Sequence, residues 1–359
     1  MTDSRAFFSI LVAREHPLAP LLKSSIRVRA FAKINLGLNV RARRRDGFHE
    51  IFTVYQTIAL HDRLTIHLAQ SEKGILVRCD DPGIPSGREN LVHRACALWA
   101  RARHYGGGIK VELEKRIPAG SGLGGGSSDA AAALLGLERL TGDRLGLAAR
   151  LKLAARLGSD VPLFLWGGRV LGCGRGEEVY PLWDFPRRPC LVVFPTFPVS
   201  TAEAYRELDQ RSRVARQFAA AAVSDRRKRL NQKPTVRDRR YKGSSCTTTA
   251  LNLGLTKESK RSNICSFGAW PHFPLEFWGP AENDFEQVVF ARWPELAGLK
   301  SQLIRAGAET ASLTGSGSAV FALFDSAPKM IRASKLIPAH GQVFKTNTLP
   351  RDEYERLIF

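Results

Sequence analysis

The chain has 359 residues, of which 44% are apolar, so it is long enough to form two packed domains. Its formal net charge of +20 raises nucleic acid as a partner, because lysine and arginine attract phosphate backbones whatever the fold. However, the segment 211–261 alone holds 15 lysines and arginines against three acidic residues, which is more than half of the excess. The charge is therefore a local feature, and a nucleic-acid partner is not favoured.

The cysteines and the apolar runs bear on cofactors and compartment. The six cysteines form no C-x-x-C pair and have no clustered histidines, which argues against a zinc site and a disulfide framework and favours a reducing, cytoplasmic setting. The apolar run 6–13 is far shorter than the roughly 20 residues that span a bilayer. A secretory signal is a weaker alternative, since Asp3 and Glu15 flank the run. We expect no membrane partner and treat residues 1–25 as a flexible extension.

In chain order, the first predicted domain covers residues 26–182. Apolar and polar residues alternate along three segments, which is typical of antiparallel strands with one solvent-facing side. These segments are 26–43, 64–69 and 108–117. Helical patterns occur at 89–102, 127–140 and 145–157. The sequence therefore predicts an α+β domain that ends near Pro181.

The second predicted domain covers residues 183–359. An apolar strand at 190–195 precedes a helix at 200–208, where Ser200 and Glu203 have the spacing of a capping box. Later elements are a helix within 283–307, paired strands at 311–315 and 318–324, a helix from Pro328 and a last strand at 342–348. This order is typical of a split β-α-β sandwich.

A basic segment at about 211–280 interrupts this second domain. It has few large apolar residues, so it cannot bury enough surface to fold by itself. We expect an insertion that is disordered over most of its length. Its aromatic and proline-rich end, 270–278, is the part expected to return to the body of the protein.

The most informative stretch is the glycine-rich run "PAGSGLGGGSSDAAAAL" at 118–134. Glycines let the backbone turn its N–H groups toward a ligand, the serines add hydroxyl groups, and the helix that Asp129 opens adds partial positive charge. The combination predicts a phosphate-binding loop. A Walker A loop is excluded because the run contains no lysine, and a dinucleotide fold is disfavoured because Pro118 and a half-polar strand precede it. A flexible linker would not lead into so apolar a helix.

This run resembles the glycine loop of the GHMP kinase family. Three further stretches resemble family motifs in the expected order: "FAKINLGLNVRARRRDGFHE", "LGSDVPLFLWGG" and "LTGSGSAVFALF". The resemblance covers about 26–204 and 283–348 and implies a two-domain α+β fold, ribosomal protein S5 domain 2-like and then ferredoxin-like. It also implies a kinase that uses ATP and Mg²⁺ to phosphorylate an alcohol, in the form found in members whose small-molecule acceptor carries a cytidine diphosphate.

The resemblance implies a catalytic pair, Asp160 and Lys33. Phosphoryl transfer mainly requires alignment and charge neutralisation, so Asp160 would accept the proton of the acceptor hydroxyl and the Lys33 ammonium would keep Asp160 ionised. From the residues alone, Asp160 is equally a helix N-cap ahead of Pro162, and Lys33 a solvated residue on the outer strand face. Asn35 shares the strand face of Lys33, and the resemblance implies that it contacts the acceptor alcohol.

The motif "DGFHE" implies, by the same resemblance, a cytosine site in which His49 reads the base edge and Phe48 stacks on the ring. Many relatives have tyrosine where this chain has Phe48, so the stacking would survive and a hydroxyl contact would be lost. Tyr205 would supply the second face of the stack. Taken alone, the motif is an ordinary surface turn, and Tyr205 is an ordinary helix-packing residue.

For ATP, the resemblance implies the glycine loop, a second donor-rich turn as the far wall of the phosphate site, and, with weaker support, two outlying residues. The second turn alone would be a plain hairpin. The predicted ATP-binding residues are Pro118, Ala119, Gly120, Ser121, Gly122, Leu123, Gly124, Gly125, Gly126, Ser127, Ser128, Asn90, Lys115, Gly315, Ser316 and Gly317. No protein residue is assigned as a ligand of the metal.

Two other functions stay open at this point. Another GHMP kinase would act on homoserine, mevalonate or a sugar and would not need a cytosine site. A nucleic-acid-binding protein would depend on the basic segment, and deletion of 211–261 would then abolish binding. The sequence is compatible with a monomer and with a homodimer.

Overall fold

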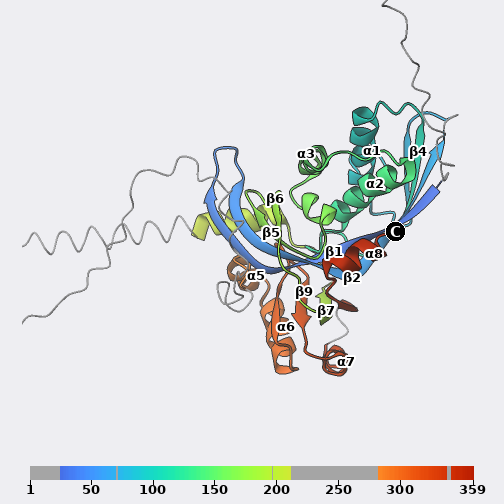
Figure 1. The fold of residues 1–359 in the computed structure, drawn as a ribbon. Helices are drawn as coiled ribbons and strands as arrows, with labels where there is room; N and C mark the ends of the chain where they lie inside the picture. The colour runs from blue at the N-terminus through green and yellow to red at the C-terminus, as the bar shows by residue number, and fades with distance from the viewer. Residues whose placement is uncertain (1–24, 70–71, 196, 212–281, 338–340) are drawn as a thin grey trace, which may run out of the picture. The chain divides into compact units, whose positions relative to one another are not determined.

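The computed structural model describes residues 25–69, 72–195, 197–211, 282–337 and 341–359 (Figure 1). The chain separates into two compact units, Met1–Ala204 with Ala281–Phe359 and Tyr205–Pro280, and every labelled element lies in the first. The predicted N-terminal extension and basic insertion lie outside the described residues, apart from Ser25 and Arg211. Among the described residues, no helix has both the length and the apolar character needed to cross a bilayer.

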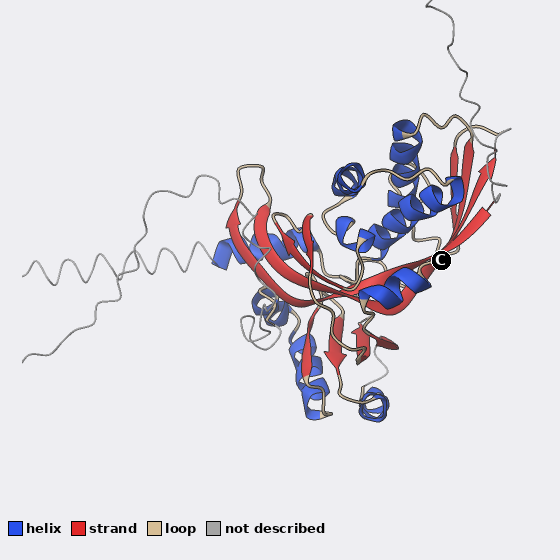
Figure 2. Ribbon diagram, in the orientation of Figure 1, coloured by secondary structure: helices blue, strands red, loops and turns tan. Residues whose placement is uncertain are grey.

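A six-stranded sheet is built around a long antiparallel hairpin of β1 (Ser25–Arg43) and β2 (His49–Ala69), the long curved strands of Figure 2. In its register, Lys33 lies opposite Thr57 and Asn35 lies opposite Tyr55. The other strands extend from β2, with β4 and β5 antiparallel to it, β3 parallel to β4 and β6 antiparallel to β5. Their bounds are Ile75–Cys79 for β3, Gly108–Glu114 for β4, Arg169–Cys173 for β5 and Glu178–Pro181 for β6.

Helix α2 (Gly125–Thr141) packs on β1 and β2 and forms the centre of the first core. Four consecutive alanines, 130–133, are buried there, and their small side chains let the helix lie close to the sheet. The approach is closest at Gly136, where a Cβ would lie 2.5 Å from Cδ1 of Ile66. The neighbouring helices are α1 (Leu91–Ala102), α3 (Leu147–Leu157) and the 3₁₀ helix η1 (Pro162–Leu165).

A second, four-stranded antiparallel sheet has the spatial order β10-β7-β9-β8. Between β7 and β8, the described chain forms a helical segment at 201–211 and the helices α5 and α6. Helix α7 lies between β9 and β10. This is the split β-α-β order that the sequence predicts. The bounds are Pro189–Phe194 for β7, Glu286–Arg292 for α5, Pro294–Arg305 for α6, Thr310–Leu313 for β8, Val320–Leu323 for β9, Ala327–Leu336 for α7 and Gln342–Asn347 for β10. The prediction of an α+β fold with two such parts is confirmed.

Several predicted elements differ from the observed ones. The helix predicted within 283–307 is two helices, because Pro294 cannot continue a helix and starts α6 instead. Helix α2 begins at Gly125 rather than at Asp129, because glycine alone can take the left-handed conformation of its N-cap, Gly124. β2 begins at His49 rather than at residue 64, and β3 pairs parallel with β4 in a sheet predicted to be antiparallel.

Five elements were not predicted from the sequence: β3, β5, β6, η1 and α8 (Arg351–Leu357). Each is short, with four to seven residues, so its pattern is too brief to be periodic. α8 packs back on the first core, where the Tyr354 hydroxyl donates to the carbonyl of Phe164 at 2.5 Å. The predicted boundary between residues 182 and 183 lies between β6 and β7.

Candidate active site

The central part of β1 is buried on both of its faces, from Ala30 to Asn35. Ala32 and Ile34 pack in a core cluster with Val192 and Phe321 of the second sheet. Lys33 is therefore only 3% exposed, and the alternative that it is a solvated outer-face residue is wrong. The alternation of apolar and polar residues suggested that one side of this strand faces solvent. A local pattern cannot reveal that the second sheet covers that side.

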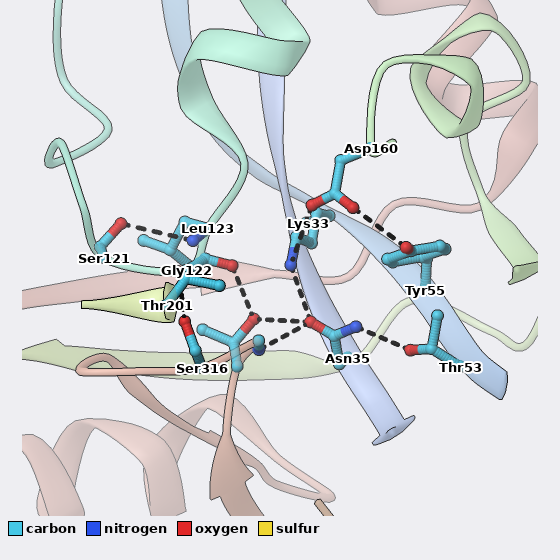
Figure 3. Close-up of polar contacts among 12 residues, drawn as sticks. Lys33, Asn35, Thr53, Tyr55, Ser121, Gly122, Leu123, Asp160, Thr201 and Ser316 are labelled. Atoms are coloured by element: carbon cyan, nitrogen blue, oxygen red, sulfur yellow. Dashed lines mark hydrogen bonds and ion pairs between the residues drawn. The ribbon is translucent and has the colours of Figure 1, made fainter. Parts of the chain in front are cut away.

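Lys33 lies at the centre of a polar group (Figure 3). Its Nζ donates to Oδ1 of Asn35 at 2.8 Å and lies 3.5 Å from Oδ2 of Asp160 and 5.6 Å from the ring centroid of Tyr55. Burial lowers the pKa of the Lys33 ammonium, and the neighbouring Asp160 carboxylate opposes that shift. The ion pair with Asp160 thus offsets part of the cost of burying the Lys33 side chain.

Asp160 lies between α3 and η1, and its carboxylate points to Lys33 and Tyr55 (Figure 3). The Tyr55 hydroxyl donates to Oδ1 of Asp160 at 3.0 Å. The N-cap of η1 is Val161 and no side chain caps it, so the N-cap alternative for Asp160 is wrong. The side chain of Asp160 is 31% exposed, so an incoming hydroxyl can reach a carboxylate that Lys33 approaches from the buried side.

Asn35 connects β1 to the turn after β8. Its Oδ1 accepts hydrogen bonds from Lys33 Nζ at 2.8 Å, from the Gly315 amide at 2.8 Å and from the Thr314 hydroxyl at 3.2 Å. Its Nδ2 donates to the Thr53 hydroxyl at 2.7 Å. With 1% exposure and both ends of the amide engaged, Asn35 orients Lys33, and its contact with the acceptor alcohol stays a prediction.

The glycine loop, residues 118–124, leads directly into α2 with most of its amides unpaired. In the described structure, the backbone N–H groups of Gly122 and Gly124 to Ser127 donate no hydrogen bond, and the first bond of α2 is from Ser128 to Gly124 at 2.9 Å. The amide of Leu123 has only a long contact of 3.4 Å to the Ser121 hydroxyl. Unpaired donors at a helix N-terminus form an anion-binding site.

The serines of the loop differ in what their hydroxyl groups do. Ser128 is 1% exposed and donates to the carbonyl of Phe31 at 2.7 Å, and Ser121 donates to the carbonyl of Pro118 at 2.7 Å. The hydroxyl of Ser127, half-buried in the first turn of α2, has no partner among the described residues. Ser128 therefore uses its hydroxyl hydrogen inside the protein, and its contact with ATP stays a prediction, whereas the Ser127 hydroxyl has no partner among the described residues.

The turn Gly315–Gly317 packs against the glycine loop, although the two are far apart in the sequence. The Thr314 hydroxyl donates to the carbonyl of Gly122 at 3.2 Å, and the Ala319 amide donates to the carbonyl of Ser121 at 3.2 Å. A Cβ at Gly122 would lie 2.1 Å from the carbonyl oxygen of Thr314, so only glycine fits there. Of the donors predicted in this turn, the amides of Gly315 and Gly317 already have protein acceptors, Asn35 and Thr314.

Asn90 and Lys115 have clear roles inside the protein. Asn90 is the N-cap of α1: its Oδ1 accepts from the Val92 amide at 2.8 Å, and its Nδ2 donates to the carbonyl of Pro85 at 2.6 Å. The ammonium of Lys115 lies between the carboxylates of Asp62 and Asp129. Contacts of Asn90 and Lys115 with ATP stay predictions.

The residues predicted to bind cytosine lie away from the Lys33 group along the hairpin. His49 pairs with Arg43, eight residues beyond Asn35 on β1, and Phe48 occupies the turn just before it. Phe48 is 51% exposed, and the guanidinium of Arg175 lies 4.8 Å from its ring centroid. Tyr205 lies in the helical segment 201–211. The cytosine site stays a prediction.

Sequence reasoning missed Tyr55 and Thr314. Tyr55 is in the part of β2 that carries no clear alternation, so no signal indicated that it faces Asp160. Thr314 stands in the quoted motif "LTGSGS", and only its position directly before the glycine turn could have suggested it. Thr201 also joins the group, with its hydroxyl 2.7 Å from that of Ser316.

Two family models match the parts of the chain that carry this site. The model described as "GHMP kinases N terminal domain" matches residues 90–168, which include the glycine loop and Asp160. The model described as "GHMP kinases C terminal" matches residues 277–335, which include the Gly315 turn.

Curated proteins named 4-diphosphocytidyl-2-C-methyl-D-erythritol kinase are similar to this chain over most of its length. The one from Solibacter usitatus is 39% identical over 332 residues, which are 92% of this chain and 90% of the relative. The one from Pelotomaculum thermopropionicum is 36% identical over 294 residues, which are 82% of this chain and 87% of the relative.

Solved structures share the fold. The crystal structure of a 4-(cytidine 5'-diphospho)-2C-methyl-D-erythritol kinase superposes with a TM-score of 0.64 at 31% identity and covers 90% of this chain and 99% of its own. The mevalonate kinase of L. major, solved with R-mevalonate, has a TM-score of 0.59 at 17% identity and covers 93% of this chain and 99% of its own. The second likeness, at so low an identity, shows the fold alone.

Proposed function

This chain belongs to the GHMP kinase family, within its group of 4-diphosphocytidyl-2-C-methyl-D-erythritol kinases, and from this membership we propose how its residues carry out the reaction. The enzyme transfers the γ-phosphoryl group of ATP to the 2-hydroxyl of 4-diphosphocytidyl-2-C-methyl-D-erythritol. The products are the 2-phosphate and ADP. The reaction belongs to the non-mevalonate route to isoprenoid precursors.

The observation that supports this most strongly is the direct connection between the ion pair and the unpaired amides. The backbone amide of Lys33 donates to the carbonyl of Leu123 at 2.9 Å, so the strand with the ammonium and the glycine loop are hydrogen-bonded to each other. A Cβ at Gly124 would lie 3.1 Å from Cγ of Lys33. An anion held by the loop would therefore lie beside the cation and the base that phosphoryl transfer requires.

In the proposed step, Asp160 accepts the proton of the substrate hydroxyl as the hydroxyl oxygen bonds to the γ-phosphorus. The bond from that phosphorus to the bridging oxygen of ADP breaks at the same centre, so ADP leaves with the electron pair. Lys33, which pairs with Asp160 at 3.5 Å, stabilises the developing negative charge on the oxygen. Tyr55, through its hydrogen bond of 3.0 Å, orients the Asp160 carboxylate.

Residues at the start of α2 fit an ATP-bound Mg²⁺. Mg²⁺ usually keeps several waters and binds through one or two protein oxygens plus the phosphates. The Ser127 hydroxyl is an unpartnered oxygen beside the unpaired amides, and no group of three or more His, Cys, Asp or Glu suited to a metal occurs among the described residues. We assign Ser127 to the ion, whose chemistry is to neutralise phosphate charge.

The cytidine part of the substrate is assigned to Phe48 and His49, with Tyr205 as the second stacking partner. The exposed ring of Phe48, at 51%, supports this assignment, because an exposed aromatic side chain is available for stacking on a base. Another GHMP kinase would not need this site. Competition between CMP and the substrate therefore discriminates between the two functions.

The decisive experiment is the assay of the purified protein with ATP, Mg²⁺ and 4-diphosphocytidyl-2-C-methyl-D-erythritol, followed by ADP formation and ³¹P NMR of the product. We expect stoichiometric ADP and a phosphomonoester at the 2-position. Homoserine and mevalonate serve as control acceptors. Turnover of a control acceptor at a comparable rate, or no ADP with the named substrate, would reject the function.

A further inference from the structure

A buried cluster of one ammonium and two carboxylates lies at the base of the glycine loop. Nζ of Lys115 is 2.5 Å from Oδ2 of Asp62 and 2.8 Å from Oδ2 of Asp129, and the three side chains are at most 7% exposed. Burying such charges costs more than burying apolar side chains of the same volume. The cluster is therefore better explained by the geometry that it imposes than by a gain in stability.

One carboxylate of the cluster holds the chain just ahead of the loop. Oδ1 of Asp62, in β2, accepts hydrogen bonds from the backbone amides of Arg116 at 2.5 Å and Ile117 at 2.8 Å. The loop begins at the next residue, Pro118. Its first end is therefore attached to the central hairpin through two amide bonds to one fully buried carboxylate.

The other carboxylate holds the helix that follows the loop. Asp129 lies near the start of α2, five residues after its N-cap, and Lys115 joins it to Asp62. The approach is tight at Gly125, where a Cβ would lie 3.2 Å from Nζ of Lys115 and 3.0 Å from Cγ2 of Ile117. The segments on either side of the loop are thus both held by the ammonium of Lys115, through Asp62 on one side and Asp129 on the other.

We propose that Asp62, Lys115 and Asp129 form a clasp that fixes the two ends of the glycine loop, so that Lys115 acts on ATP as a positioning residue through the loop. The inference rests on the proposed function, because the spacing of the ends matters only if the loop amides bind phosphates. The backbone amides of residues 122–127 lie between the two ends of the loop, and most of them are unpaired. The directions in which their N–H bonds point depend on the distance between those two ends. A displacement of about 1 Å at such a site commonly reduces activity by roughly a hundredfold.

The test measures binding of a non-hydrolysable ATP analogue with Mg²⁺ by calorimetry, together with the KM for ATP and for the alcohol substrate. Lys115→Met should weaken nucleotide binding at least about tenfold and leave the KM for the alcohol within about threefold. Lys110→Met is the matched control, since this half-buried lysine on β4 forms an ion pair with Glu112 away from the glycine loop, and it should bind as the wild type does.

Two further variants separate positioning from direct contact between Lys115 and phosphate. Asp62→Asn removes a negative charge, which by charge alone would strengthen phosphate binding, whereas loss of the clasp weakens it. Asp129→Leu also removes an acidic group, together with the oxygen that lies 2.8 Å from Nζ of Lys115, so charge alone would strengthen phosphate binding whereas loss of the clasp weakens it.

Each outcome either supports or overturns the clasp, even if one variant fails to fold. If Lys115→Met does not fold, the other two variants decide: equal or tighter nucleotide binding by Asp62→Asn or by Asp129→Leu overturns the clasp. Wild-type-like binding by a folded Lys115→Met also overturns it. A wild-type protein that does not bind the analogue overturns the proposed function itself, which is a different result from a binding wild type with unaffected variants.

Discussion

The ammonium of Lys33 lies 3.5 Å from the carboxylate of Asp160, and the two are exposed to solvent to very different degrees, 3% and 31%. The strand supplies a lysine that is almost fully buried, and the segment before η1 supplies a carboxylate that is partly exposed to solvent. This asymmetry suits a site in which the base must meet an incoming hydroxyl while the cation stabilises charge from behind.

Replacement of Asp160 tests the base. Asp160→Asn should lower kcat by about 10²–10⁴, the usual contribution of a general base, while nucleotide binding measured by calorimetry stays within about twofold. Tyr55→Phe is the graded comparison, because it removes only the hydrogen bond of 3.0 Å to the carboxylate, and it should cost about tenfold or less. An Asp160→Asn protein with near-normal turnover would contradict the assignment.

Replacement of Lys33 should separate stability from activity. Lys33→Met removes a buried ammonium whose pKa is lowered by desolvation, so we expect an inactive protein that is at least as stable as the wild type. Because the lowered pKa lets the unfolded state bind more protons, the free energy of unfolding of the wild type should rise relative to that of the variant as the pH rises toward 10.5, the ordinary pKa of a lysine. Urea unfolding at a series of pH values below 10.5 measures this difference, and an opposite slope would contradict the shift.

Gly122 tests the contact between the two glycine turns. In Gly122→Ala, the new Cβ would lie 2.1 Å from the carbonyl oxygen of Thr314 at a backbone φ of +81°, so the turns must separate. We expect a loss of about 2–3 kcal/mol of stability and a large rise in the KM for ATP. The control Gly298→Ala, in the middle of α6 with no atom within 4 Å of its Cβ, should be slightly more stable with unchanged kinetics.

Asn35 and Thr314 should be energetically coupled. Asn35→Ala leaves the half-buried Gly315 amide and the buried Lys33 ammonium without their acceptor, so we expect a loss of about 2–4 kcal/mol and a fall in kcat. Thr314→Val removes only the bonds of 3.2 Å and should cost about 1 kcal/mol. A double-mutant cycle from thermal unfolding should show that the two costs are not additive, whereas simple additivity would show that Asn35 does not connect the two parts.

Much of the fold could be predicted because many of its elements have a local cause. The apolar–polar alternation of 26–43 and 108–117 and the helical pattern before Ala102 indicated β1, β4 and α1 to within a few residues. The glycine run predicted a loop before a helix because its composition allows few other conformations. The short β5 and β6 have no such cause, since pairing with β2 and with each other stabilises them.

For the site, the sequence by itself determined which residues and segments are available: a glycine loop before an alanine-rich helix, a lysine in an apolar strand, and an aspartate ahead of a proline. It left open whether Lys33 is solvated or buried and whether Asp160 is a helix N-cap. Only the tertiary structure decided that Lys33 is buried and that Asp160 is not the N-cap, because burial and ion pairing depend on β1, β2, η1 and the turn after β8 meeting at one place. Interactions between segments so far apart in the chain leave no periodic trace in either segment.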